Sequence, residues 1–101
     1  MSEATWFGRA FCTVGAVREE FRSGHRGAVF SFACRAPTVL DCVAMVREEA
    51  VENSLDLKGF EFIMQKDYMD REPSGYEQEL EERLGEYPVQ FKNVHFFMPD
   101  T

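Results

Sequence analysis

The residues that could ligate a metal or attack a substrate are three cysteines and two histidines, spread widely along the chain. Cys12, Cys34 and Cys42 stand with His25 and His95, and no two of them have C-x-x-C or H-x-x-x-H spacing. Structural zinc sites usually collect four such ligands from closely spaced pairs. The sequence therefore predicts no metal site, and the cysteines are expected to pack as small core residues.

A catalytic site would need a nucleophile, a base or a phosphate-binding loop in a recognisable pattern. The chain has no glycine-rich phosphate loop and no serine in a G-x-S-x-G elbow. His95 is the best single acid–base candidate, and Cys34 or Cys42 could pair with it only if the fold brought them together. A lone histidine in an apolar strand pattern is more often a structural residue. We therefore expect a protein that is not an enzyme and carries no cofactor.

Charge is unevenly distributed along the chain. The net charge is −7, to which residues 1–35 contribute +2 and residues 36–101 contribute −9. Nucleic-acid binding is driven by lysines and arginines that release counterions from phosphates, so nucleic acid is not an expected partner. An acidic surface instead steers a basic protein to its docking site.

Seven glutamates are the candidate partner-binding residues, because they fall on the polar sides of two predicted helices. They are Glu48, Glu49, Glu52, Glu77, Glu79, Glu81 and Glu82. The alternative is that they only hydrate the helices. Residues 18–26 are a candidate anion-binding segment, because three arginines and His25 could hold an anion there. A solvated loop is the more common role for such a segment.

Hydrophobic periodicity predicts strands and helices in the order ββαβαβ. They are expected at residues 5–17, 28–35, 37–53, 60–68, 76–84 and 89–98. The first two strands should form a hairpin, and Ser74 with Glu77 has the spacing of a capping box. Phe60, Phe62 and Met64 are expected to share one face of the third strand. We expect an α+β fold in one domain, residues 1–101, with a mostly antiparallel four-stranded sheet and both helices packed on one face.

Cellular location is indicated by what the sequence lacks. No basic segment is followed by an apolar stretch at the start of the chain, and no apolar run approaches the roughly 20 residues that span a bilayer. Three widely spaced cysteines do not form a disulfide framework. We expect a cytoplasmic protein that does not bind membranes.

Three functional hypotheses follow. The favoured one is a non-enzymatic, acidic protein-binding module, most sharply an immunity- or antitoxin-like inhibitor of a basic partner protein, by analogy of size and acidity alone. The second is a small α+β enzyme or ligand-binding domain, dimeric, with a pocket near His95. The third is an obligate homodimer whose aromatic sheet face is the interface, suggested by ten phenylalanines in 101 residues.

Overall fold

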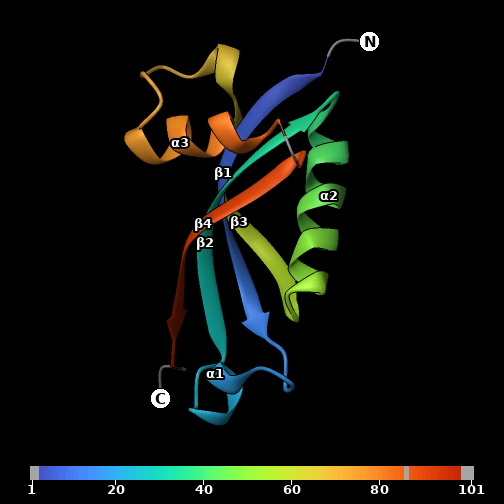
Figure 1. The fold of residues 1–101 in the computed structure, drawn as a ribbon, viewed down its shortest axis with the longest axis vertical. Coiled ribbons are helices and arrows are strands. Elements are labelled where there is room, and N and C mark those ends of the chain that lie inside the picture. The colour runs from blue at the N-terminus through green and yellow to red at the C-terminus, as the bar shows by residue number, and fades with distance from the viewer. Residues whose placement is uncertain (1–2, 86, 99–101) are drawn as a thin grey trace.

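A computed structural model describes residues 3–85 and 87–98 (Figure 1). In chain order the elements are β1 (Ala4–Val14), α1 (Glu19–Arg22), β2 (Gly27–Ala36), α2 (Val39–Glu52), β3 (Leu55–Gln65), the 3₁₀ turn η1 (Lys66–Tyr68), α3 (Gly75–Arg83) and β4 (Val89–Phe97). The strands form an antiparallel sheet in the order β3-β1-β2-β4. The predicted α+β class and the ββαβαβ order of the main elements are confirmed, and α1 adds one helical turn at the tip of the hairpin.

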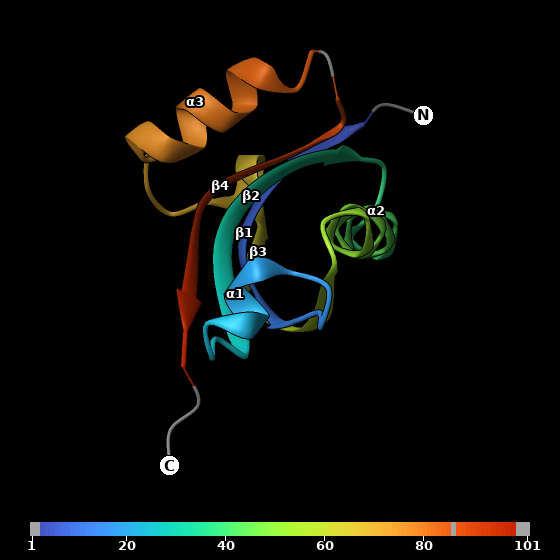
Figure 2. The ribbon, with the colours of Figure 1, turned by 60° about the horizontal axis from the view of Figure 1, so that its bottom comes forward.

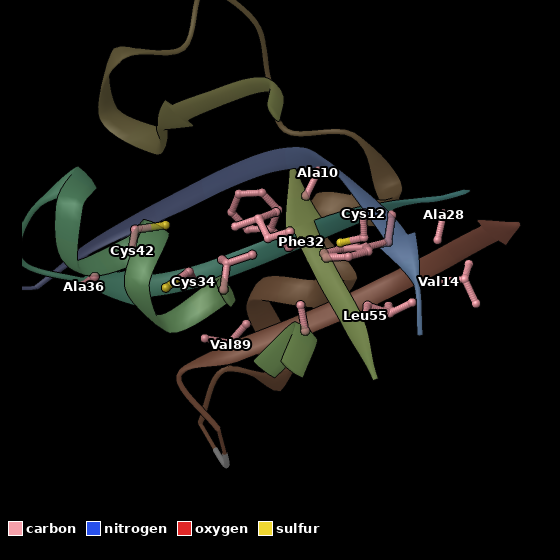
Figure 3. Close-up of a cluster of buried hydrophobic side chains, with 14 residues drawn as sticks. Ala10, Cys12, Val14, Ala28, Phe32, Cys34, Ala36, Cys42, Leu55 and Val89 are labelled. Carbon is pink, nitrogen blue, oxygen red and sulfur yellow. The ribbon is translucent and has the colours of Figure 1, made fainter. Parts of the chain in front are cut away.

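The helix α2 packs on the concave face of the curved sheet (Figure 2). Cys42, Val46 and Ala50 recur every fourth residue, so they share one side of the helix, and all three are buried. They meet the buried Phe30 and Phe32 of β2 in the larger of two core clusters (Figure 3). The apolar stripe predicted from the sequence is therefore the side of α2 that contacts the sheet.

The helix α3 covers part of the opposite face. Phe7 and Ala33 are direct partners across β1 and β2, and they form a separate buried cluster with Leu80 and Leu84. Successive strand residues point to opposite faces, so this cluster lies across the sheet from the α2 core. Figures 1 and 2 show α2 and α3 on opposite sides. The expectation that both helices pack on one face is thus corrected, because helical periodicity does not say which face of a sheet a helix will meet.

The strand β3 starts at Leu55 rather than at residue 60 and contains two irregularities. Its pairing with β1 leaves Lys58 and Glu61 as extra residues, each forming a bulge. The bulges change which face the following residues meet, so Leu57, Phe60 and Ile63 all contact the α2-side core. The predicted common face for the alternating aromatic residues of this strand is therefore wrong.

Candidate partner-binding groove

An open groove of about 770 Å³ crosses the concave face of the sheet between the C-terminal half of α2 and β4. The helix side is lined by Glu49, Glu52 and Asn53. The strand side is lined by Val89, Gln90, Phe91, Val94 and Phe96. A smaller hollow of about 130 Å³ shares Glu49 and Glu52 with the groove and extends it to Glu48. The three glutamates predicted on α2 are therefore brought together along one groove.

The aromatic side of the groove is produced by an irregularity in β4. Phe91 lies opposite Phe32 of β2, and Phe96 lies opposite Ala28, with a register shift between the two pairs. The shift places both rings on the α2 side of the sheet, where Phe91 stacks on Phe30 with ring centroids 3.9 Å apart. Strict alternation along the sequence would have separated Phe91 from Phe96, so periodicity alone does not place them in one site.

The glutamates of α2 are not neutralised by ion pairs among the described residues. Within residues 3–85 and 87–98, no ion pair includes Glu48, Glu49 or Glu52. Partial burial, followed by the neighbouring charge of Glu52, raises the pKa of Glu49 above its ordinary value. A cation placed in the groove would relieve this repulsion. Carboxylates next to aromatic rings are the surroundings that a guanidinium or ammonium group favours.

Arg18 lines one end of the groove, and its guanidinium group already has partners within the chain. Its Nε donates to Glu20 Oε1 at 2.9 Å, and a terminal nitrogen donates to the carbonyl of Asn53. Its guanidinium carbon lies 5.1 Å from the centroid of the Phe96 ring. Arg18 therefore ties the hairpin tip to the end of α2, and its contact with Phe96 shows that the groove accepts a guanidinium on an aromatic surface.

Arg26, a second basic residue of the hairpin tip, also serves local structure. Arg26 Nη1 donates to the carbonyls of Phe21 at 2.8 Å and His25 at 3.1 Å. Its guanidinium carbon lies 3.7 Å from the centroid of the Phe21 ring. These contacts hold the tip in shape, so an anion would have to compete with them.

Glu77 belongs to α3, on the opposite side of the sheet from the groove. It is 6% exposed, and its carboxylate accepts hydrogen bonds from Arg71 Nη1 at 2.6 Å and Nη2 at 3.0 Å. It also accepts from the backbone N–H of Ser74 at 2.8 Å, which completes the predicted capping box. The Arg71 hydrogen bond is the main cause that lowers the pKa of Glu77. This carboxylate therefore stabilises the N-terminus of α3.

Two further α3 glutamates are paired with cations. Glu79 accepts from Arg83 Nη2 at 3.1 Å and from Lys92, whose hydrogen bond is the main cause that lowers the pKa of Glu79. Glu81 accepts from Lys66 Nζ at 2.8 and 2.9 Å. These contacts join α3 to β4 and to η1.

The seven predicted glutamates thus divide by location and by partner. The three on α2 lie along the groove and are in no ion pair of the described residues. Three of the four on α3 are neutralised within the protein, and Glu82 is exposed and in no ion pair of the described residues. The structure does not place the two sets on a common surface.

His95 lies on the α3 side of the sheet, opposite Val29 of β2. It is exposed and borders an open hollow of about 610 Å³ with Arg9, Ser31 and Tyr76. This hollow is shallow rather than a closed pocket that converges on the imidazole.

The three thiols lie in the core, and their surroundings differ from those of nucleophilic cysteines. Burial, followed by the charge of Asp56, raises the pKa of Cys12 to about 11. A hydrogen bond between Cys34 and Cys42, together with burial, raises the pKa of Cys42. The same hydrogen bond lowers the pKa of Cys34, but this thiol is fully buried and has no solvent access. A reactive cysteine has a lowered pKa and solvent access. Across residues 3–85 and 87–98, no group of three or more cysteine, histidine, aspartate or glutamate side chains could hold a metal ion.

Comparisons with protein-family models, with curated proteins and with solved structures found no match to the chain. In the part of the chain that the structure describes, no helix has both the length and the apolar character needed to cross a bilayer. The groove between α2 and β4 is therefore the basis on which a function is assigned.

Proposed function

We propose that this protein is a non-enzymatic binding module that holds a basic segment of a partner protein in the groove between α2 and β4. The observation that carries the proposal is the pair Glu49 and Glu52, which lies next to the aromatic side of the groove and is in no ion pair of the described residues. An arginine or lysine of the partner would supply the missing positive charge. Its sharpest form is an immunity- or antitoxin-like inhibitor of a basic toxin, acting in the cytoplasm.

An arginine suits this groove better than a lysine. Its planar guanidinium can lie on Phe91 or Phe96 and still donate in its own plane to a carboxylate. An ammonium group is a point charge and is more strongly hydrated, so it gains less from an aromatic surface. Arg18 already uses Phe96 in this way from within the chain.

The raised pKa of Glu49 indicates an environment in which binding of a cation is favourable. Burial and the neighbouring charge of Glu52 disfavour ionisation of Glu49, and an incoming cation offsets that penalty. The α3 glutamates offer less, because a partner would first have to displace Arg71, Lys66 or Lys92. The preferred surface is therefore the groove, and α3 is not needed for binding.

Charge reversal in the groove tests this proposal. The probe is a fluorescent nine-residue peptide in which arginine alternates with valine. Its association with the E49K/E52K variant should be about tenfold slower or more at low salt, because electrostatic steering is reversed at the site of contact. Stopped-flow fluorescence measures the rate, and circular dichroism checks that the variant is folded.

The matched control is E72K/E82K, which changes the net charge by the same amount on exposed residues away from the groove. Its association rate should stay within about twofold of the wild-type rate. Equal slowing in both variants would mean that the peptide responds to overall charge, and the groove would then have no specific role.

A further inference from the structure

The two edges of the sheet are built differently. The edge strand β3 contains the bulges at Lys58 and Glu61, and both side chains are in ion pairs, to Asp56 at 2.7 Å and to Arg9 at 3.4 Å. Bulges and charged side chains are the usual means by which an edge strand is kept from pairing with another chain. The β3 edge is thus protected.

The opposite edge, β4, is less protected. It is nine residues long and has a single register shift against β2. Val94 is 40% exposed and Phe97 41%, and Met98 beyond the strand is 56% exposed. An edge strand presents a row of backbone N–H and C=O groups that can pair with an incoming strand.

The groove reaches this less protected edge. Val89 and Phe91 line it from the α2 side of the sheet, as expected from their cross-strand partners Cys34 and Phe32. Gln90 also lines it, although Gln90 lies between those two residues and so points to the other face. The groove therefore extends from the concave face to the outer edge of β4.

We propose that the partner segment binds in extended form, as a fifth strand paired with the free edge of β4. Alternate side chains of an added strand point to the same face. Those on the concave side would enter the groove, where a basic side chain meets Glu49 and Glu52, and main-chain hydrogen bonds to β4 would hold the segment in register. This inference rests on the proposed function and adds the conformation and register of the ligand.

Charge favours a basic partner segment over a second copy of this chain at the same edge. A second copy paired through β4 would bring a second set of α2 carboxylates to the same side of the enlarged sheet, and like charges across an interface oppose association. A segment with arginine at alternate positions instead complements the groove, because all of its arginines can lie on the face of the added strand that meets the carboxylates.

N-methylation of the peptide probe distinguishes strand addition from simple charge attraction. Two versions of the Arg–Val peptide are compared, with backbone methyl groups on the arginines in one and on the valines in the other. In an added strand, the N–H groups of only one alternate set face β4. We expect one version to bind about tenfold more weakly than the unmodified peptide, or worse, and the other to bind within about threefold, because several backbone hydrogen bonds are lost in only one of them.

The possible outcomes separate strand addition from the proposed function. Equal binding by both methylated peptides, with binding still dependent on Glu49 and Glu52, would overturn strand addition and leave the proposed function standing. Failure of the unmodified peptide to bind would remove the proposed function. Dimerisation of the chain alone in sedimentation, reversed by substitution of Val94 with lysine, would assign the β4 edge to a second copy and overturn this inference.

Discussion

Glu49 on α2 and Glu77 on α3 are the same residue type on helices that pack against the same sheet. Their pKa values are displaced in opposite directions, upward for Glu49 through burial and the neighbouring charge of Glu52, and downward for Glu77 through Arg71. The difference comes from cations supplied by other parts of the chain. Carboxylates with cations hold the fold together, whereas those without cations remain available to bind a partner.

The largest expected change in stability comes from replacement of Glu77, the member of this pair on α3. Replacement of Glu77 by alanine should lower the free energy of unfolding by about 2 kcal/mol, because a buried carboxylate that accepts charged and capping hydrogen bonds is lost. Urea denaturation measures the change. E82A on the same helix is the control and should change stability by no more than about 0.5 kcal/mol. If the two variants lose the same stability, Glu77 has no special structural role.

A smaller effect is expected at the other half of the capping box. Replacement of Ser74 by alanine should cost about 1 kcal/mol, since the hydroxyl accepts the backbone N–H of Glu77. The double variant S74A/E77A should then lose less than the sum of the two single changes, because each residue caps the other. Strictly additive losses in urea denaturation would contradict a reciprocal cap.

The smallest expected change in stability is a gain, and it comes from replacement of Glu49. A raised pKa means that ionisation costs the folded state more than the unfolded state. The contribution of Glu49 to stability is therefore greatest below its ordinary pKa of 4.5 and is lost as the pH rises through the folded value. E49Q cannot ionise, so at pH 7 it should be more stable than the wild type by about 0.3 kcal/mol, a small value because the group is largely solvated.

This advantage of E49Q should disappear at acid pH, where Glu49 of the wild type is protonated in both states. Thermal denaturation followed from pH 3 to pH 7 measures the difference between the two proteins. E48Q is the control, on the same helix and exposed. A stability gain for E49Q that stayed constant with pH would show that ionisation is not its cause.

Much of the fold was predictable from the sequence because local signals agreed with it. Thr38 accepts the N–H of Asp41 at the start of α2, and Ser74 and Glu77 form the box that their spacing indicated. The start of β3 differs from its prediction for a local reason as well. The strand begins at Leu55 rather than at residue 60, and Lys58 forms a bulge against β1.

The candidate site was only partly predictable. The glutamates on α2 were identified from their type and charge, but nothing near them in sequence shows that Phe91 and Phe96 face them across the groove. Two of the cations that neutralise α3 glutamates, Lys66 and Lys92, are distant in sequence from their partners. Pairings of this kind depend on strand order and register, which composition and periodicity do not determine.

The two faces of the sheet bury unequal numbers of apolar residues, and this difference affects which part of the protein unfolds first. The α2 cluster contains fourteen buried residues, whereas the α3 cluster contains four, Phe7, Ala33, Leu80 and Leu84. Local unfolding free energies follow buried apolar contact, so α3 is expected to detach as a cooperative unit of its own while the other face stays intact. In hydrogen exchange its amides would then exchange before those of β1 and β2. The molecule is in this sense a stable core of sheet and α2, with α3 attached to it by a small apolar cluster and by ion pairs to Lys66 and Lys92.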